Sequence, residues 1–179
     1  TNPTTGTLPV RVGGMALNTA GNASAACDGT GKPVTLTFLG NSATAAASTT
    51  FQYADAGQVT ITASYTGSAS EPGLSLSGSK NVIVAPDSFA FSNVTSGVIK
   101  AGGTFGATVT ARNALNNTTP NFGREITPAK VDVTFTRRLP AGPASIVSPL
   151  VSDGIFTGTL GAFSAGAASS TNLSWSEVG

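Results

Sequence analysis

The stretch Phe51-Gln-Tyr-Ala-Asp-Ala-Gly-Gln-Val-Thr-Ile-Thr-Ala-Ser-Tyr65 decides the fold. From Gln58 to the end of this stretch, polar side chains at even-numbered positions alternate with apolar side chains at odd-numbered positions. Alternation with a period of two is the pattern of a β-strand that buries one face and exposes the other. We therefore expect residues 58–65 to form a central strand whose odd-numbered face is packed in the core.

A turn interrupts the same stretch before the central strand begins. Phe51 and Tyr53 continue the odd-numbered alternation on the amino-terminal side of this turn. Asp55 can bond the backbone nearby and Gly57 can adopt a positive φ, so both residue types favour a turn. The stretch therefore predicts an entry arm, then a structural corner at Asp55 and Gly57, and then the central strand.

Composition places the whole chain in the all-β class. Among 179 residues there are 22 Gly and 10 Pro, whereas charged residues make up only 9%. Helix-forming residues are scarce, and Val, Thr and Phe recur in short alternating runs, as expected for strands joined by many turns. These runs predict further strands at residues 8–12, 34–38, 74–76, 81–84, 89–91, 105–112, 131–135 and 155–160.

The tripeptide Ala85-Pro-Asp87 separates two parts of similar size. We expect module 1 at residues 1–86 and module 2 at residues 87–179, each an immunoglobulin-like β-sandwich, because several short strands in about 90 residues suit that fold. A jelly roll is the alternative. Two usual marks of the immunoglobulin fold are absent: Val59 stands where a corner Tyr is expected, and Cys27 is the sole cysteine, so no disulfide can form within the chain.

An internal repeat links the two modules. Apolar, aromatic, acidic and glycine residues follow one another at every second position in Phe51-x-Tyr-x-Asp-x-Gly57 and in Leu173-x-Trp-x-Glu-x-Gly179. The repeat predicts core aromatic residues at Tyr53 and Trp175 and structural corners at Asp55, Gly57, Glu177 and Gly179. Because module 1 continues past its corner with further strands, we expect module 2 to be truncated before its last strands.

Each module is expected to bury the apolar face of its alternating runs. A slip of one residue would turn every apolar side chain outward, so the alternation fixes which residues are buried. The predicted core of module 1 consists of Val34, Leu36, Phe38, Phe51, Tyr53, Val59 and Ile61. The predicted core of module 2 consists of Phe105, Val109, Val131, Val133, Phe135 and Trp175.

The chain lacks the residues that catalysis most often requires. It contains no His, one Cys and eight carboxylates, which removes histidine-assisted nucleophiles and leaves few ligands for a zinc site. We therefore expect a protein that is not an enzyme, with no catalytic residue, no cofactor and no metal. The net charge of +1 predicts no nucleic-acid partner. The absence of an apolar run of about 18 residues predicts no membrane insertion of this segment.

Two features leave a binding role open. Tyr53 and Trp175 could stack on sugars, but both share a parity with positions expected to be buried, which favours core packing. The second feature is a mild basic cluster, which is either a solvated face or a contact for an anionic glycan. This cluster consists of Arg124, Lys130, Arg137 and Arg138.

Five strings of residues carry a family resemblance: Phe51-Gln-Tyr-Ala-Asp-Ala-Gly-Gln-Val-Thr-Ile-Thr-Ala63, Ala101-Gly-Gly-Thr-Phe105, Val109-Thr-Ala-Arg-Asn-Ala114, Thr119-Pro-Asn-Phe-Gly-Arg-Glu125 and Asn172-Leu-Ser-Trp-Ser-Glu-Val-Gly179. They resemble the carboxy-terminal region of MshQ-type proteins, large bacterial surface proteins associated with the mannose-sensitive haemagglutinin type IV pilus. The last two strings are the most specific. The resemblance transfers no catalytic residue.

The resemblance implies an extracellular protein at the bacterial cell surface. The expected function is a structural and adhesive segment of a secreted, pilus-associated surface protein, which spaces a binding head from the cell or takes part in assembling a surface filament. Its partners would be other subunits or domains of that assembly. One alternative is a module that binds a glycan or a host protein. Another is a filament subunit joined by strand addition, with residues 4–12 as the donor and open edges at residues 131–135 and 173–175.

Overall fold

The structure is a computed structural model that describes residues 6–13, 16–17, 31–38, 46–128, 130–136 and 154–177. All regular secondary structure in these residues is β-strand. The chain divides into two compact units, unit 1 (Thr1–Val84) and unit 2 (Ala85–Gly179). Each unit has its own four-stranded sheet, so each is built as a separate all-β body.

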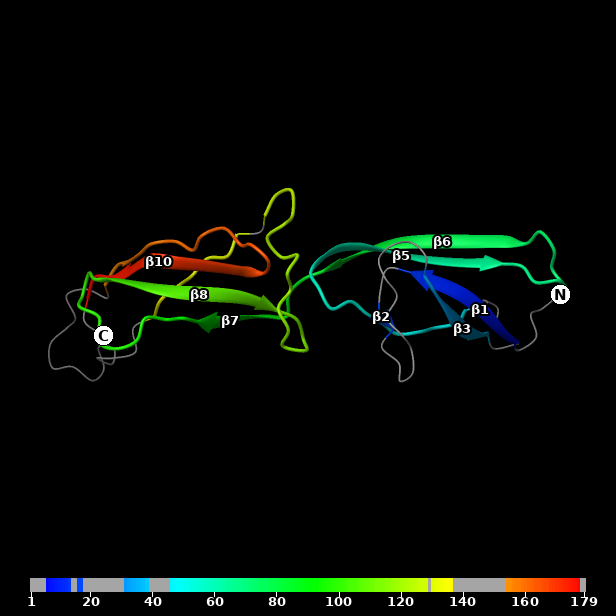
Figure 1. Ribbon diagram of the computed structural model, residues 1–179, viewed down its shortest axis with the longest axis horizontal. Coiled ribbons are helices and arrows are strands. Elements are labelled where there is room, and N and C mark those ends of the chain that lie inside the picture. The colour runs from blue at the N-terminus through cyan, green and yellow to red at the C-terminus, as the bar shows by residue number, and fades with distance from the viewer. Residues whose placement is uncertain are drawn as a thin grey trace. The chain divides into compact units, whose positions relative to one another are not determined.

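Unit 1 is organised around an antiparallel sheet with the strand order β3-β1-β5-β6 (Figure 1). The strands of this sheet are β1 (Gly6–Gly13), β3 (Lys32–Phe38), β5 (Gly57–Thr66) and β6 (Ser75–Val84). A second sheet of two strands pairs β2 (Ala16–Leu17) with β4 (Phe51–Gln52). The strands predicted at residues 8–12, 34–38 and 58–65 are therefore confirmed.

The corner at Asp55 carries the chain from one sheet of unit 1 to the other. The entry arm is β4 in the two-stranded sheet, and the central strand is β5 in the four-stranded sheet. The Asp55 Oδ1 accepts a hydrogen bond of 2.7 Å from the backbone N–H of Ala56, which is itself buried. Gly57 has a φ of 132°, the positive value that the sequence predicts. A Cβ at Gly57 would meet no atom within 4 Å, so glycine is required there by the backbone angle alone.

The predicted register of the central strand is confirmed. Thr60 and Thr62 are exposed, whereas Val59 and Ile61 are partly buried and Tyr65 is buried. Val34 is the buried centre of the core, and the residues packed against it are Leu36, Phe51, Ile61 and Ala63. Of the other predicted core members, Tyr53 and Val59 are partly buried, and the side chain of Phe38 lies outside the described residues.

Strand β6 forms one edge of the unit 1 sheet. The sequence predicts two short strands at residues 74–76 and 81–84, but a single continuous strand pairs with β5 over ten residues. Lys80 lies directly opposite Ile61 in this ladder, so it stands on the apolar face of the sheet. Lys80 is exposed, and a charged residue on an edge strand is a known device that opposes pairing with further strands.

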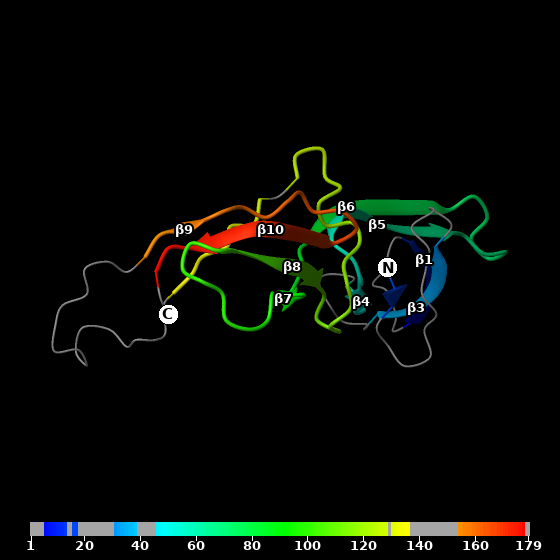
Figure 2. The same cartoon turned by 60° about the vertical axis from the view of Figure 1, so that its left-hand side comes forward.

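Unit 2 contains an antiparallel sheet with the order β7-β8-β10-β9 (Figure 2). Its strands are β7 (Ser88–Ser92), β8 (Thr104–Arg112), β9 (Phe156–Thr157) and β10 (Ala167–Trp175). The edge position predicted for residues 89–91 is confirmed by β7. The strand predicted at residues 155–160 is shorter than expected and consists of β9 alone.

A β-bulge in β10 changes whether its even-numbered or its odd-numbered residues are buried. The ladder with β8 shifts register between Ser170 and Leu173. Before the bulge, the buried residues have even numbers, Ala168 and Ser170; after it, the buried residue is Leu173. One extra residue in one strand reverses the in–out alternation beyond it. The odd-numbered parity predicted from Leu173 and Trp175 therefore does not extend back through the strand.

The core of unit 2 centres on Val109, Ala111 and Leu173, which are all 1% exposed or less. Three phenylalanines pack at one end of it. Phe122 and Phe163 are buried, with ring centroids 4.9 Å apart in a T-shaped contact, and the ring of Phe89 lies 5.7 Å from that of Phe122. Of these core residues, only Val109 was predicted.

The strand predicted at residues 131–135 is wrong. These residues belong to no strand, although Val131 and Val133 are partly buried and the polar residues between and beside them are exposed. Phe135 is 39% exposed but stacks on Phe156, with ring centroids 4.3 Å apart, and contacts Phe105 edge-on at 5.6 Å. The segment therefore packs its side chains on the sheet without joining the ladder.

The strand-addition scheme with residues 4–12 as donor is also wrong. Strand β1 pairs with β3 on one side and with β5 on the other, so it already lies inside its own sheet. Leu173 and Trp175 do not form an open edge, because β10 has β8 on one side and β9 on the other. The described part of residues 4–12 is therefore committed within unit 1.

The Thr-Pro-Asn-Phe-Gly string has a structural role. Thr119 is 1% exposed, and its backbone N–H donates to the Ala111 carbonyl at 3.0 Å while its hydroxyl donates to the same oxygen at 3.3 Å. Phe122 enters the core three residues later. Gly123 has a φ of 90°, and its backbone packs directly on Phe163. The string thus fixes a loop over the end of β8.

Candidate functional site

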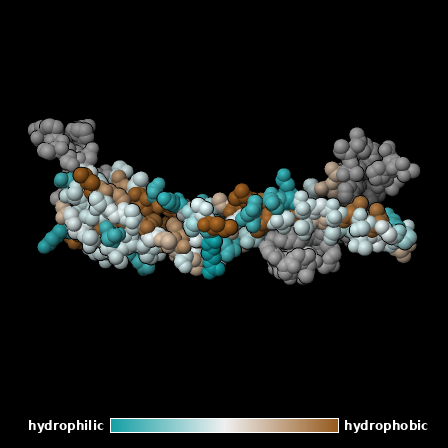
Figure 3. Space-filling model, turned by 90° about the horizontal axis from the view of Figure 1, so that it is seen from above, coloured by the Kyte–Doolittle hydropathy of each residue, from teal (hydrophilic) through white to brown (hydrophobic). Residues whose placement is uncertain are grey.

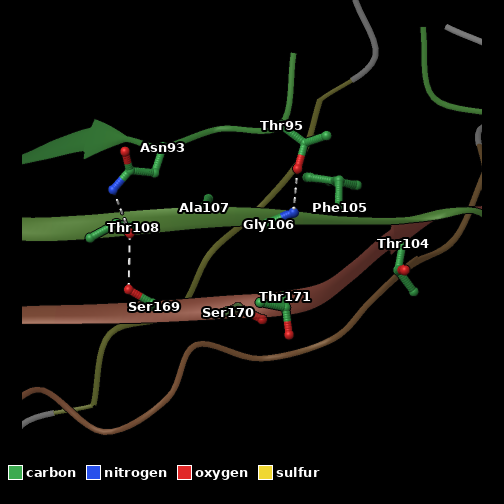
Figure 4. Close-up of a pocket in the computed structure, with 10 residues that line it drawn as sticks. All are labelled: Asn93, Thr95, Thr104, Phe105, Gly106, Ala107, Thr108, Ser169, Ser170 and Thr171. Carbon is green, nitrogen blue, oxygen red and sulfur yellow. Dashed lines mark hydrogen bonds between the residues drawn. The ribbon is translucent and has the colours of Figure 1, made fainter. Parts of the chain in front are cut away.

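A groove of about 380 Å³ lies on the outward face of the unit 2 sheet. It crosses β8 and β10 and reaches the segment that follows β7 (Figure 4). The residues that line it are Asn93, Thr95, Thr104, Phe105, Gly106, Ala107, Thr108, Ser169, Ser170 and Thr171. It combines a concave surface with several polar side chains that converge on it.

On β8, the groove is formed by outward-facing hydroxyl side chains on either side of a glycine. Odd-numbered residues of β8 such as Ala107 are buried, so Thr104 and Thr108 face outward. Gly106 lies between them, opposite the bulge of β10. A Cβ at Gly106 would lie 3.1 Å from the Ser170 carbonyl oxygen, a tight contact. The absence of a side chain at Gly106 therefore lets the bulge approach and hollows the face.

Three polar side chains form a row across the groove. The Asn93 side-chain amide donates to the Thr108 hydroxyl at 3.4 Å, and the hydroxyls of Thr108 and Ser169 are 2.9 Å apart (Figure 4). Asn93 has a φ of 49°, which turns the chain at the end of β7. The row thus joins one residue from each of three adjacent segments.

Thr95 closes one end of the groove against Gly106. The Thr95 N–H donates to the Gly106 carbonyl at 3.0 Å, and the Gly106 N–H donates to the Thr95 hydroxyl at 2.8 Å. These two bonds hold the segment after β7 beside β8. The wall of the groove is therefore fixed by backbone as well as side-chain bonds.

The chemistry of the groove is that of neutral hydrogen bonding. Its lining provides hydroxyls, one amide and methyl groups, and none of its ten residues carries an ionisable group. Hydroxyls donate and accept, so they match the hydroxyls of a neutral sugar ring. General acid or base catalysis needs a titratable group, which this lining does not contain. Cross-strand hydroxyl pairs also stabilise the sheet itself.

A smaller groove of about 210 Å³ lies on unit 1. It is mainly apolar and is lined by Leu36, Ala63, Ser64, Tyr65, Leu76, Ser77 and Gly78. The Tyr65 hydroxyl donates a hydrogen bond of 2.6 Å to the Glu71 carboxylate in the loop between β5 and β6. This bond to a carboxylate, together with burial, raises the pKa of Tyr65 above its ordinary value.

The site residues predicted from the sequence do not gather in the groove. Tyr53, Asp55 and Gly57 belong to unit 1, and none of them lines either groove. Trp175 is partly buried in β10, where a Cβ on Gly154 would lie 2.6 Å from its indole ring. Glu177 is exposed in the bend after β10, and Gly179 lies outside the described residues.

The groove residues were not singled out by the sequence. Thr104 and Thr108 follow the polar parity of a strand, which predicts an exposed face but not a hollow one. The bulge that creates the hollow has no sequence signal here beyond Gly106. A glycine at an outward position of an otherwise regular strand was the one available sign.

Other kinds of site find little support in the described residues. They contain no group of three His, Cys, Asp or Glu side chains placed to hold a metal ion. A helix long and apolar enough to span a membrane is likewise not found among them. Arg124 and Lys130 of the predicted basic cluster are exposed, whereas Cys27, Arg137 and Arg138 lie outside the described part of the chain.

The face of the described residues seen from above is mostly polar or weakly apolar (Figure 3). In the view of Figure 3, hydrophobic residues appear in separate brown patches among white and teal ones. In unit 2, Phe91 is 59% exposed and Phe89 is 44% exposed. Both of these aromatic residues belong to β7, the strand at the edge of its sheet.

Comparisons with known proteins identify one region. Residues 1–79 match the protein family described as "Domain of unknown function (DUF6701), first Ig-like domain". Comparisons with curated proteins and with solved structures give no match. The matched region covers most of unit 1, and it ends within β6. Together with the all-strand architecture, this match shows that the chain has an all-β, immunoglobulin-like fold.

Proposed function

We propose that this chain is a non-catalytic structural segment of a secreted bacterial surface protein, associated with a pilus, that spaces an adhesive head from the cell. Its location would be extracellular, at the cell surface. Its partners would be other domains or subunits of the same assembly. A glycan or host ligand, if present, would be bound mainly by the head that the segment carries.

The observation that carries this proposal is the tandem arrangement of two all-β units. Strand β6 ends at Val84 and β7 begins at Ser88, so only Ala85, Pro86 and Asp87 join the units. Pro86 lies in this connection and has a restricted φ and no backbone N–H. A row of small β-sandwiches joined by short linkers is an economical way to build length outside a cell.

Three further observations support the proposal. The match of residues 1–79 to an immunoglobulin-like domain fits a module of a surface protein. The net charge of +1 provides no field that would attract nucleic acid. The resemblance of strings such as Thr119-Pro-Asn-Phe-Gly-Arg-Glu125 to MshQ-type proteins supplies the association with a pilus.

A replacement experiment tests the spacing role. In cells that make the surface protein, the segment is deleted in one strain and replaced in another by two unrelated immunoglobulin-like domains of equal length. Antibody labelling of intact cells checks that each version reaches the surface. We expect deletion to reduce adhesion and the replacement to restore it. Loss of adhesion in both strains would show that the segment itself binds, and the spacing role would be rejected.

The groove of unit 2 favours a second candidate function, which is direct binding of a neutral glycan. Its volume of about 380 Å³ is large enough for a sugar residue, and its lining matches sugar hydroxyls. A glycan array probed with the purified chain tests this function. If glycans bind, Thr108→Val should weaken binding roughly tenfold, because it removes the central hydroxyl of the polar row.

Thr110→Val is the matched control for that measurement. Thr110 is the next outward-facing residue of β8, and it does not line the groove. It should therefore leave binding unchanged. An array with no bound glycan, or equal losses in the two variants, would reject the groove as the binding site.

A further inference from the structure

We propose that β7 is a docking edge for a second copy of this chain. The two copies of Ser88–Ser92 would pair antiparallel about a two-fold axis at Ala90, which would join the two unit 2 sheets into one. This pairing would be a property of unit 2 and does not depend on the proposed spacing role. The first argument for it concerns the backbone of β7.

The outer edge of β7 presents backbone groups with no partner among the described residues. β7 is the terminal strand of its sheet and pairs with β8 on one side only. Ala111 donates its N–H to Gly166, on the β10 side, whereas Gly106 bonds Thr95, on the β7 side. The direction in which the backbone N–H and C=O groups point alternates along a strand. The backbone groups of the even-numbered residues of β8 therefore point toward β7.

The same alternation fixes which residues of β7 face outward. The register places Ser88, Ala90 and Ser92 opposite even-numbered residues of β8. Their N–H and C=O groups therefore turn toward β8, and those of Phe89 and Phe91 turn toward the free edge. Two residues with both backbone groups outward can form four hydrogen bonds to a second strand.

The sequence of β7 is complementary to itself. Ser88-Phe-Ala-Phe-Ser92 reads the same in both directions. An antiparallel pair centred on Ala90 places each Phe89 opposite Phe91 of the second copy and each Ser88 opposite Ser92. Phe89 and Phe91 are also the residues whose backbone groups face the edge. The side-chain pattern and the hydrogen-bond pattern therefore select the same register.

The side chains of β7 would gain burial from this pairing. Phe89 is 44% exposed and Phe91 is 59% exposed, although both stand on the core-facing side opposite Ala111 and Val109. The ring of Phe89 already packs within 6.1 Å of Phe163. A second copy would extend this aromatic cluster across the axis, and aromatic cross-strand pairs are favourable.

Charge does not oppose the pairing at this edge. Ser88–Ser92 contains no charged residue and no proline, so no like charges meet across the axis. The edge of unit 1 differs, because β6 carries Lys80 on its apolar face. An uncharged, aromatic edge lacks the usual features that prevent association.

The expected association is weak in solution. The exposed fractions of Phe89 and Phe91 add up to about one phenylalanine side chain, roughly 200 Å² per copy. A stable dimer buries about 1,200–2,000 Å² in total. We therefore expect a concentration-dependent dimer, with dissociation in the high micromolar range or above, that gains strength where many copies are held side by side.

Disulfide trapping tests the register directly. In a Cys27→Ser background, Ala90→Cys places the two thiols across the axis, where facing Cα atoms of a non-hydrogen-bonded pair are about 4.5 Å apart. Ser92→Cys is the matched control, since its partner is Ser88 and the two introduced thiols lie about 13 Å apart at about 3.3 Å per residue. Under mild oxidation, we expect a covalent dimer from Ala90→Cys and monomer from Ser92→Cys. Equal cross-linking of the two variants would overturn the proposal.

Sedimentation equilibrium of the 179-residue chain provides the second measurement. Phe91→Pro removes an outward N–H that β8 does not use, and Phe91→Val removes the ring but keeps that N–H. We expect the chain to associate as concentration rises, Phe91→Pro to abolish association, and Phe91→Val to weaken it less. Trp175 fluorescence confirms that each variant is folded. A chain that stays monomeric at millimolar concentration, or that associates unchanged with Phe91→Pro, would overturn the proposal.

Discussion

The backbone of Gly123 lies directly against Phe163. A Cβ on Gly123 would overlap the Cβ of Phe163 and would come within 2.8 Å of its carbonyl oxygen. Gly123 also has a φ of 90°, a value that residues other than glycine rarely adopt. The loop that carries Phe122 into the core of unit 2 therefore depends on a glycine at this point.

Gly123→Ala should destabilise unit 2 strongly. The substitution adds a clash with backbone to the cost of the positive φ, and we expect a loss of about 3 kcal/mol or more in the free energy of unfolding. Urea unfolding followed by the fluorescence of Trp175, the sole tryptophan, measures unit 2 specifically.

Gly97→Ala is the matched control for this prediction. Gly97 has a φ of 88°, and a Cβ there would meet no atom within 4 Å. It should cost only the backbone strain, about 1 kcal/mol. Equal losses from the two alanines would show that the contact with Phe163 contributes nothing.

Gly57→Val should destabilise unit 1 by about 1–3 kcal/mol, because a β-branched residue does not readily adopt a positive φ. Hydrogen exchange of the β5 amides reports this loss locally. Gly78→Ala in β6 is the control, since Gly78 has no positive φ and open space at its Cβ. It should change stability by less than about 0.5 kcal/mol. Unchanged exchange in Gly57→Val would contradict the importance of the corner.

The stability of unit 1 should decline in alkaline solution through Tyr65. Its pKa is raised in the folded state, so the folded chain holds this proton more tightly than the unfolded chain. The resulting stabilisation is fully present below the ordinary tyrosine pKa of about 10, and it is lost as pH rises through the folded value. Thermal unfolding between about pH 8 and about pH 11 should show the decline, and Tyr65→Phe should reduce it.

The ultraviolet absorbance of ionised tyrosine gives an independent measure of the same pKa. The chain contains two tyrosines, Tyr53 and Tyr65. We expect Glu71→Gln to lower the pKa of Tyr65 toward its ordinary value, because the hydrogen bond to a carboxylate is lost. A titration curve that is the same with and without the Glu71 carboxylate would contradict this account.

Ser170 and Asn172 should act together to hold the bulge of β10. The Ser170 hydroxyl donates to the Asn172 Oδ1 at 2.6 Å and accepts from the Asn172 N–H at 3.3 Å. Ser170 is buried, so Ser170→Ala should cost about 1–2 kcal/mol. The exposed neighbour Thr171→Ala should cost less than about 0.5 kcal/mol. A double-mutant cycle with Asn172→Ala would reveal the coupling, and additive losses would rule it out.

Regular alternation made the central strands predictable. In β5 and β8 every second residue is apolar and is packed against its own sheet's core, so parity alone identifies the buried face. The corner was predictable for a different reason, since Asp55 and Gly57 are both turn-favouring residues and lie between two runs of equal parity. Local chemistry was sufficient wherever the strand was regular.

The sequence did not predict the structure correctly where the alternation of buried side chains does not follow the pairing of strands. Val131 and Val133 alternate in burial with their neighbours, yet the segment forms no ladder, because alternating contact requires only an extended chain. In β10 the bulge reverses the parity after Ser170, and its small residues carry no strong strand signal. Phe122 lies in a turn-rich stretch, so its burial follows from tertiary packing that no local pattern records.

The outward groove could not be predicted for the same reason. Its Thr and Ser residues read as an ordinary exposed face of a strand. The hollow arises from the meeting of Gly106 with a bulge in another strand far along the chain. Such a feature depends on pairing between segments and not on either segment alone.

The topology of unit 1 also sets how the unit carries a mechanical load. β1 and β6 both run antiparallel to β5, with Gly13 opposite Thr62 and Val84 opposite Gly57. Gly6 and Val84 therefore lie toward opposite ends of the sheet. A pull between them acts along the strands, so it shears all the hydrogen bonds of a ladder at once instead of opening them in turn.

The two ladders in that load path are unequal. Within the described residues, β5 and β6 pair over ten residues, whereas β1 and β5 pair over three, from Arg11 to Gly13. Under tension the short ladder is the one that yields first, and the long hairpin of β5 and β6 stays intact behind it. Unit 1 would then lengthen by releasing its amino-terminal strands while the hairpin that leads into the second unit still bears force.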